Sequence, residues 1–361
     1  MSSFKVPNFK GSAGRPTIDD VAALSGVARA TVSRALNGGP NVSADVRARV
    51  ARAVTELDYQ VNMQARALAG GKARKLVLIY AMDPLGEVNS FYHMGLELGA
   101  LRACGEAGLH LMMQGQDQTS GAAAADILGW LDAEGCVGAI LTPPFSDDAG
   151  LVAAIVARQL PIVCVAPGAP VRGLAGGVGI DEAQASYDLT RHLLSLGHQR
   201  FGFIKGHAGH LSAEDRYAGF VRALSDACIA ADSVVCARGN FTFRSGVERS
   251  AEILAGASRP SALICANDDM ATGALFTAYR MGLDVPRDLS VAGFDDTPMS
   301  GVVWPPLTTV HQPLQQMGCR AVERIVADLK AVQRGAEPAA ARFEAVPHRV
   351  VVRGSAARPA V

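Results

Sequence analysis

The sequence predicts a small all-α head followed by an α/β body built from two doubly wound lobes with parallel sheets. Three observations support this fold class. Residues 17–57 contain short helical patterns separated by a glycine turn, and short apolar runs alternate with helical stretches from Leu76 onward. A chain of 361 residues is also too long for one ordinary hydrophobic core.

The formal net charge of zero conceals a separation of charge along the chain. Residues 1–75 contain 12 Lys and Arg against 5 Asp and Glu, and the chain has 34 of each class, so residues 76–361 carry 22 against 29. A basic first unit is typical of proteins that bind a polyanion. The alternative, a basic surface that only aids solubility, remains open on charge alone.

The cysteines and the start of the chain indicate a soluble, cytoplasmic protein with no membrane partner. The seven cysteines are widely spaced, odd in number and mostly set in apolar segments, which favours free thiols over disulfides or a metal site. The first residues lack the apolar stretch of a signal peptide, and no apolar run reaches the ~18 residues of a membrane span. We expect residues 1–16 to form a flexible extension.

The first helix of the head is predicted to begin after Thr17. Thr17 and Asp20 have the spacing of a capping box, in which each side chain accepts the backbone N–H of the other residue. We expect Val21 and Leu24 to face inward and Gly26 to supply the turn that follows. These features predict the first half of a helix-turn-helix unit.

The second and third helices complete this unit. Residues 28–36 form the second helix with Val32 on its buried side, and Ser43 caps the third helix. The outward side of the second helix carries Arg29, Ala30, Ser33 and Arg34. Such a helix fits the major groove of DNA, where an arginine can donate two hydrogen bonds to guanine. The alternative is a generic three-helix bundle with a charged surface.

Two stretches, "TIDDVAALSGVARATVSRALNG" and "VSADVRARVARAVTELDYQVN", resemble the DNA-binding head of the LacI/GalR repressor family. The resemblance implies that residues 17–61 form a helix-turn-helix domain that binds double-stranded DNA. It assigns the contacts with DNA to Thr17, Arg29, Ala30, Thr31, Ser33, Arg34 and Asn37. Arg29 and Ala30 occupy the two positions that vary with operator sequence, and Arg47 and Arg49 are expected near the DNA backbone.

Residues 62–75 connect the head to the body. The stretch "NMQARALAGG" contains good helix formers but is too short to hold a helix alone in water. In the family the matching segments of two subunits pair and insert a leucine into the minor groove, which implies this role for Leu68. The alternative is a plain linker. Val61 stands where the family often has proline.

The body, residues 76–352, contains seven apolar runs that predict buried parallel strands. These runs are residues 75–81, 109–113, 136–142, 161–166, 200–204, 261–266 and 289–294. The helices predicted between them include residues 92–107, 182–195, 213–229 and 267–281. We interpret the glycine-rich stretch at 175–179 as a turn. Ligands of doubly wound sheets bind beyond the carboxyl ends of the strands, so the residues after each run are candidates for a binding site.

Polar and aromatic side chains gather at these positions. A hydroxyl-rich ligand needs hydrogen-bond donors and acceptors and aromatic rings against its apolar faces. The candidates are Asp83, Phe91, Tyr92, Arg216, Phe241, Asn267, Asp268 and Asp295. Each Asp or Asn can instead cap the helix that follows it, and Asn267 is the plainest case. His207 and His210 lie in a loop that can reach the same cleft, whereas His198 is interpreted as a turn residue.

The resemblance to the LacI/GalR family extends through "SAEDRYAGF", "CANDDMATGAL", "VPRDLSVAGFDDTPMS" and "WPPLTTVHQPLQQMG", and so covers residues 17–352. It implies two lobes of the periplasmic-binding-protein type around an effector cleft. It assigns to this cleft Ser212, Arg216, Phe241, Asn267, Asp295 and Gln312. Ala166 departs from the aspartate that some sugar-binding relatives have at this place.

These features together predict a transcriptional regulator that acts as a repressor and is controlled by a small-molecule effector of carbohydrate type. It is expected to bind an approximately palindromic operator as a homodimer. No stable tetramer is expected, because the tail at 353–361 lacks the leucine heptads of a coiled coil. No catalytic motif is present, so no catalytic residue, cofactor or metal is expected. The alternatives are a sugar-binding transport protein, which would need an export signal, and an architectural DNA-binding protein, which would need no cleft.

Overall fold

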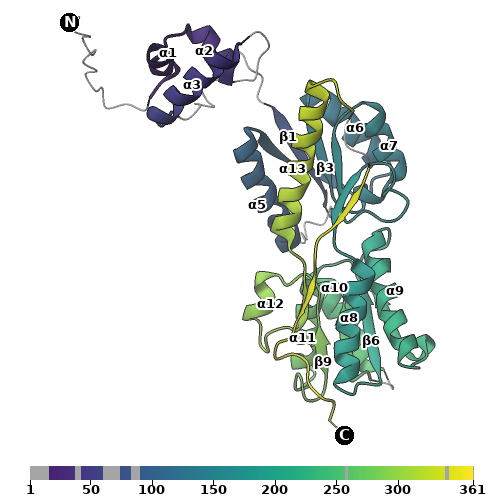
Figure 1. Cartoon of the computed structure of the whole chain (residues 1–361). Coiled ribbons are helices and arrows are strands. Elements are labelled where there is room, and N and C mark those ends of the chain that lie inside the picture. Colours follow the sequence, from purple (N-terminus) through teal and green to yellow (C-terminus); the bar gives the residue numbers. More distant parts are fainter. Residues whose placement is uncertain are drawn as a thin grey trace, which may run out of the picture. The chain divides into compact units, whose positions relative to one another are not determined.

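The computed structural model of the chain describes residues 16–36, 42–59, 74–82, 90–256, 259–337 and 341–360. The chain divides into two compact units, Met1–Ala73 and Arg74–Val361 (Figure 1). Among the described residues, no helix combines the length and the apolar character needed to pass through a bilayer.

The head consists of α1 (Ile18–Ser25), α2 (Arg29–Leu36) and α3 (Ala44–Glu56). These helices enclose a small core of Val21, Val32, Val50, Ala53 and Tyr59. The predicted capping box is confirmed, because Thr17 accepts the N–H of Asp20 and Asp20 accepts the N–H of Thr17. The prediction for Leu24 is wrong, since this side chain is 37% exposed. Val21 and Ser25 fill the buried face of α1, and one helical step of about 100° carries Leu24 off that face.

The turn between α1 and α2 is held by a side chain of α3. Gly26 adopts the left-handed conformation with φ of 65°, as predicted. The guanidinium of Arg49 donates hydrogen bonds to the carbonyls of Ser25 at 2.6 Å and Gly26 at 3.0 Å. Ser43 caps α3 by accepting the N–H of Val46. Arg49 therefore fixes the angle at which α2 leaves α1.

The first lobe of the body is a six-stranded sheet covered by helices on both faces. Its strands are β1 (Lys75–Met82), β2 (His110–Asp117), β3 (Gly138–Leu141), β4 (Ile162–Val165), β5 (Gly176–Gly179) and β11 (Phe343–Ala345). They pair in parallel in the order β11-β5-β4-β3-β1-β2. One face packs on α5 (Ser90–Ala107) and α13 (Leu314–Gln333), the other on α6 (Ala123–Glu134) and α7 (Ala149–Ala157).

The second lobe contains the parallel sheet β7-β6-β8-β9. Its strands are β6 (Phe201–Lys205), β7 (Val235–Arg238), β8 (Ala262–Cys265) and β9 (Ser290–Ala292). Its helices are α8 (Glu182–Ser195), α9 (Leu211–Asp226), α10 (Phe243–Ala255), α11 (Asp268–Arg280) and α12 (Pro298–Val302). A ribbon of β10 (Thr309–His311) and antiparallel β12 (Arg349–Val351) completes the lobe. Short 3-10 turns are η1 (Phe145–Asp147) and η2 (Ala231–Ser233).

All seven predicted strands are confirmed, and the helix predicted at 182–195 has the observed bounds of α8. The interpretation of residues 175–179 as a turn is wrong, because Gly176–Gly179 form β5. A Cβ atom on Gly177 would lie 2.9 Å from Pro167, and one on Gly176 would lie 2.4 Å from Arg324. Gly177 therefore packs too closely on Pro167 for a side chain, whereas the atoms next to Gly176 belong to the flexible side chain of Arg324. Because the strand is almost all glycine, no run of apolar side chains marks it in the sequence.

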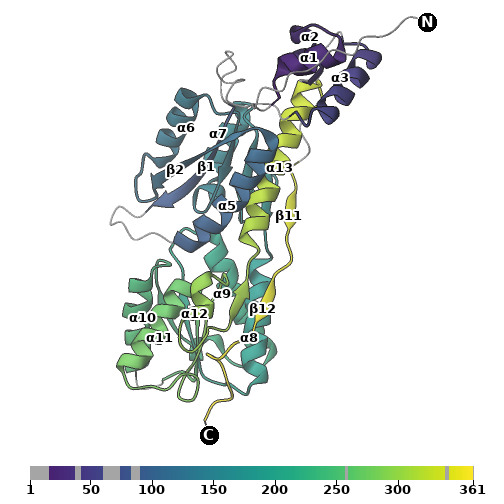
Figure 2. The ribbon, with the colours of Figure 1, turned by 90° about the vertical axis from the view of Figure 1, so that its left-hand side faces the viewer.

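The described chain passes from one lobe to the other after β5, after β10 and after β11. Figure 2 shows β11 in the first lobe continuing into β12 in the second. The segment expected to be a C-terminal tail is integrated into the second lobe, where Ser355 is fully buried and accepts the N–H of Val291 through its carbonyl. His198 is a loop residue as predicted, and its ring contacts Ser261, Ser290 and the carbonyl of Ala357.

Candidate functional site

The outward side of α2 has the composition expected of a DNA-reading surface. Arg29, Ala30 and Arg34 are exposed, and Thr31 and Ser33 are partly buried. The guanidinium of Arg29 lies 3.6 Å from the carboxylate of Asp19. Because both side chains are exposed to solvent, this ion pair is weak, and Arg29 can leave it for a stronger partner. The remaining predicted contacts, Asn37 and Leu68, lie outside the described residues, and so does Asp83 of the predicted cleft.

A cavity of about 210 Å³ lies between the two lobes of the body. The first lobe lines it with Ala81, Tyr92, His93, Gln118, Thr119 and Pro143. The second lobe lines it with His207, His210, Ser212, Arg216, Asn240, Phe241, Thr242 and Asp295. The structure thus brings together seven residues named from the sequence: Tyr92, His207, His210, Ser212, Arg216, Phe241 and Asp295.

Arg216 is the charged centre of this cavity. Its Nε donates to Glu182 at 2.8 Å, its Nη1 lies 3.7 Å from Asp295, and its guanidinium stacks on Phe294. Burial acts to lower the pKa of Arg216, but the two carboxylates outweigh it and raise that pKa. Burial raises the pKa of Asp295 well above its ordinary value, although Arg216 acts in the opposite direction. Arg216 therefore keeps its charge, and Glu182 of the protein itself supplies a counter-ion.

Phe241 is positioned by residues on both sides of it. Asn267 caps α11 by accepting the N–H of Met270, and its side-chain amide donates to the carbonyl of Phe241 at 2.8 Å. A Cβ on Gly206 would lie 2.0 Å from the Phe241 ring, so the ring lies directly on bare backbone. Asn267 is almost fully buried and does not line the cavity. Its observed contacts are those of a helix cap that orients a cavity residue.

Three histidines form one wall of the cavity. His207 and His210 belong to the loop predicted to reach the cleft, whereas His93 was not predicted. Burial lowers the pKa of His93 to about 4 and that of His210 to about 3, so both rings are neutral at pH 7. The ring of His210 lies 5.3 Å from those of His207 and Phe241, measured between centroids. Among the described residues, Nδ1 of His93 and Nδ1 of His207 have no hydrogen-bond partner. Both nitrogens are buried in this arrangement, so each is an unpaired polar atom beside the cavity and not an exposed one.

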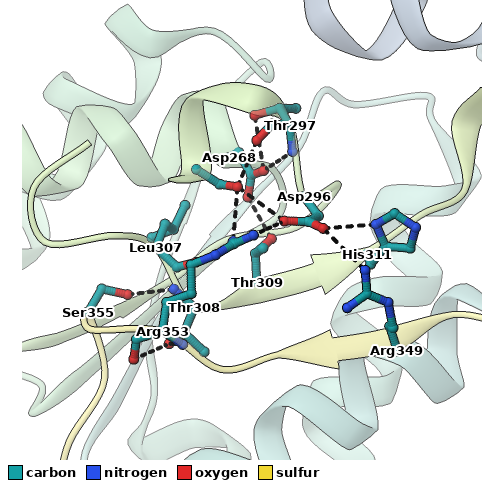
Figure 3. A network of polar contacts seen from close by, with 11 residues as sticks. Asp268, Asp296, Thr297, Leu307, Thr308, Thr309, His311, Arg349, Arg353 and Ser355 are labelled. Carbon is teal, nitrogen blue, oxygen red and sulfur yellow. Dashed lines mark hydrogen bonds and ion pairs between the residues drawn. The ribbon is translucent and has the colours of Figure 1, made fainter. Parts of the chain in front are cut away.

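Asp268 lies away from the cavity, in a polar network of the second lobe (Figure 3). Its carboxylate is fully buried and accepts hydrogen bonds from the Thr297 backbone at 2.7 Å and the Thr309 hydroxyl at 2.6 Å. Burial raises its pKa to about 7. In the same network, Asp296 binds His311 and Arg353. These contacts attach β10 and the C-terminal segment to the end of β9.

Phe91 and Gln312 line a second, more open hollow of about 720 Å³, which Asp295 also borders. Gln312 lies at the crossing before α13 and donates from its side chain to Asp295 at 2.7 Å. Gln312 therefore reaches the cavity between the lobes only through Asp295, and Phe91 does not line that cavity. Gln118, Thr119, Asn240 and Thr242 line that cavity without having been named from the sequence. The rule that ligands bind after the strands points to all four, since they follow β2 and β7.

Comparisons with known proteins agree with both units of the chain. Residues 17–62 match the lacI family of bacterial regulatory proteins, and residues 190–356 match a periplasmic binding protein-like domain. The regulator CelR of Thermobifida fusca is 31% identical over 324 residues, which cover 87% of this chain and 92% of CelR. The regulator GalR of Escherichia coli (strain K12) is 31% identical over 315 residues, which cover 86% of this chain and 88% of GalR.

Solved structures give the same result. A CelR–cellobiose complex has a TM-score of 0.70 and 28% identity, and the match covers 94% of this chain and 100% of that one. A lac repressor dimer bound to operator and the anti-inducer ONPF has a TM-score of 0.71 and 26% identity, covering 95% and 100%. This chain belongs to the LacI/GalR family of DNA-binding transcriptional regulators.

Proposed function

We propose that this regulator is a homodimeric repressor whose affinity for an approximately palindromic operator is controlled by a carbohydrate bound between the lobes. The observation that carries the proposal is the cavity lined from both lobes by neutral imidazoles, amides, hydroxyls and one paired arginine. A polyhydroxylated molecule satisfies such donors and acceptors, and Tyr92 and Phe241 offer rings for its apolar faces. The cellobiose complex of CelR supports this choice of ligand class.

The head reads the operator through α2. Arg29 donates to a base edge, Ala30 contacts an apolar group such as a thymine methyl, and the polar residues around them bind phosphates. Thr17, Thr31, Ser33, Arg34 and Asn37 are the proposed positioning contacts. The wedge proposed at Leu68 kinks the duplex when two subunits pair. The lac repressor dimer on its operator supports this arrangement.

Dimerisation is proposed to use exposed apolar side chains of both lobes. In the first lobe, Met94, Leu98 and Leu101 recur along α5 at helical spacing and are exposed. In the second lobe, α11, α12 and the residues that follow expose Phe276, Tyr279, Met281, Val302 and Trp304, which we call the lower apolar face. Large exposed apolar side chains of this number are typical of an interface between subunits.

The effector acts by preferring one arrangement of the lobes. Because the cavity has walls from both lobes, a ligand that touches both stabilises their closed arrangement. A coupling of about 1–3 kcal/mol between effector and operator would change operator affinity roughly 5- to 150-fold. Binding accounts for this function without catalysis, and among the described residues no group of three or more His, Cys, Asp or Glu is arranged to hold a metal.

A carbohydrate screen by thermal shift, followed by operator titrations, tests the proposal. At least one carbohydrate is expected to stabilise the purified protein and to change its operator affinity. Arg216→Ala is expected to keep operator binding and lose the response, whereas Arg222→Ala, an exposed arginine on the same helix, keeps both. A variant at 216 that responds like the parent protein contradicts the assignment of the cavity. Operator affinity that no carbohydrate changes contradicts the proposed function.

A further inference from the structure

The two lobes are joined beside the cavity by a single carboxylate. Asp147 ends η1, which follows β3 in the first lobe. Its Oδ1 accepts the N–H of Gly168, in the loop after β4 of the same lobe, at 2.7 Å. Its Oδ2 accepts the N–H of Leu211, the first residue of α9 in the second lobe, at 3.0 Å. Asp147 therefore connects the backbones of both lobes.

This contact occupies the place of a helix cap. The N-cap residue of α9 is His210, and its side chain makes no capping hydrogen bond within the described residues. By contrast, α7 and α8 are capped by Asp148 and Asp181, the residues that immediately precede them. A helix start has backbone N–H groups without partners in the helix, and α9 satisfies one of them with a carboxylate from the opposite lobe.

Packing and a second polar contact show that the two lobes fit closely together around the start of α9. A Cβ on Gly168 would lie 2.2 Å from Cδ1 of Leu211, so the leucine of the second lobe rests on a residue of the first that has no side chain. The ring of His210 pairs with the side chain of Gln118 in the first lobe at 3.0 Å. Two successive residues of the second lobe thus hold partners in the first, directly before Ser212 and Arg216.

We propose that Asp147 is a positioning residue that caps α9 across the cleft only while the lobes are closed. Opening the lobes removes the cap from the helix that carries Ser212 and Arg216, so the placement of these residues depends on closure. Loss of a side-chain cap shifts a two-state equilibrium by about fivefold. The consequence for effector affinity rests on the proposed function, whereas the cap itself does not.

Hydrogen exchange on the full-length protein without effector tests the cap directly. In Asp147→Ala, the amides at the start of α9, residues 211–213, are expected to exchange about fivefold faster than in the parent protein. Asp147→Asn keeps one acceptor oxygen and is expected to give an intermediate rate. The matched control is Asp148→Ala, which removes a cap and a charge of the same kind within one lobe and is expected to speed exchange at the start of α7 alone.

Effector titration separates a positioning role from a purely structural one. Asp147→Ala is expected to weaken effector binding about fivefold, whereas Asp148→Ala lowers the melting temperature and leaves effector affinity unchanged. Unchanged exchange at residues 211–213 in Asp147→Ala, both without ligand and with a carbohydrate that stabilises the parent protein, overturns the proposal. An equal loss of effector affinity in both variants overturns it as well. Faster exchange in a protein that responds to no carbohydrate leaves the cap standing and refutes the proposed function instead.

Discussion

At the scale of single residues, Arg29 and Arg34 are the two side chains of α2 with the reach and the donors to identify a base, and the family resemblance assigns the variable base contact to Arg29. Its solvent-exposed pair with Asp19 costs little to break, so the guanidinium is free to turn toward a guanine. Arg29→Ala is expected to lose about 1–3 kcal/mol of discrimination at one position of each half-site. Competition titrations against operators changed one base pair at a time measure this loss. A base preference identical to that of the parent protein contradicts the role.

Asp268 gives a second prediction at this scale, in the pH dependence of stability. Burial raises its pKa from an ordinary 3.8 to about 7, so between these values the folded state keeps a proton that the unfolded state has lost. The contribution of Asp268 to stability is therefore present below pH 3.8 and is lost as the pH rises through about 7. Unfolding midpoints between about pH 4 and pH 8 are expected to fall less steeply in Asp268→Asn than in the parent protein. Parallel curves for the two proteins contradict it.

The candidate residues of the cleft show how far a binding site can be predicted from the rule that ligands bind beyond the carboxyl ends of parallel strands. Arg216 and Asp295 line the cavity. Asn267 and Asp268 follow a strand equally closely, but Asn267 caps α11 and Asp268 accepts a hydrogen bond from a buried threonine. A polar residue after a strand can either bind a ligand or cap the N-terminus of the next helix, and its position in the sequence does not distinguish these two roles. His207 and His210 belong to the one loop that was predicted to reach the cleft. His93 lies on α5 of the other lobe and joins them only because the two lobes meet, which no local pattern encodes.

At the scale of elements, the strands that lie in continuous apolar runs were predictable, whereas β5, β7, β10, β11 and β12 were not predicted. The runs that became β1, β3 and β8 are continuous and apolar because helices cover both faces of their sheets. β5 is almost all glycine, and β11 and β12 have three residues each, so tertiary pairing alone makes them strands. The helices of the head were predictable because Thr17, Gly26 and Ser43 mark their ends with capping chemistry.

The lower apolar face gives a prediction at the scale of elements. Tyr279 is 82% exposed and Trp304 is 88% exposed, on or beside α11 and α12. A buried unpaired carboxylate destabilises an interface strongly, so the double variant Tyr279→Glu, Trp304→Glu is expected to sediment as a monomer. It is also expected to bind a single half-site with little preference for a palindrome. Lys330→Glu, at the exposed end of α13, serves as the control; a variant that stays dimeric excludes this face from the interface.

At the scale of the whole molecule, we expect the charges around the cavity to favour an uncharged effector. Among the described residues that line it, Arg216 is the single Lys or Arg, and the carboxylate of Glu182, at 2.8 Å, already neutralises its charge. His93 and His210 are neutral at pH 7 because burial lowers their pKa values. A phosphorylated or carboxylated carbohydrate would bury an unpaired anion, at a cost of about 3 kcal/mol or more.

The expected result is that a neutral carbohydrate binds at least about 100-fold more tightly than its phosphate ester. Calorimetric titration of matched pairs, each carbohydrate beside its own monophosphate, checks this preference at one pH and one salt concentration. Tighter binding of the phosphorylated member of a pair contradicts the charge balance described for Arg216.

Residues 343–357 contribute to both lobes, so they determine when each lobe of a newly synthesised chain can complete its folding. β11 forms the edge of the first sheet, and Ser355 and Ala357 bond to Val291 and Ser290 in the second lobe. Neither lobe can therefore be completed on the ribosome until this segment has left the exit tunnel, long after β1 has emerged. The nascent body carries unfinished sheet edges throughout its synthesis, which makes it a substrate for chaperones that bind such edges.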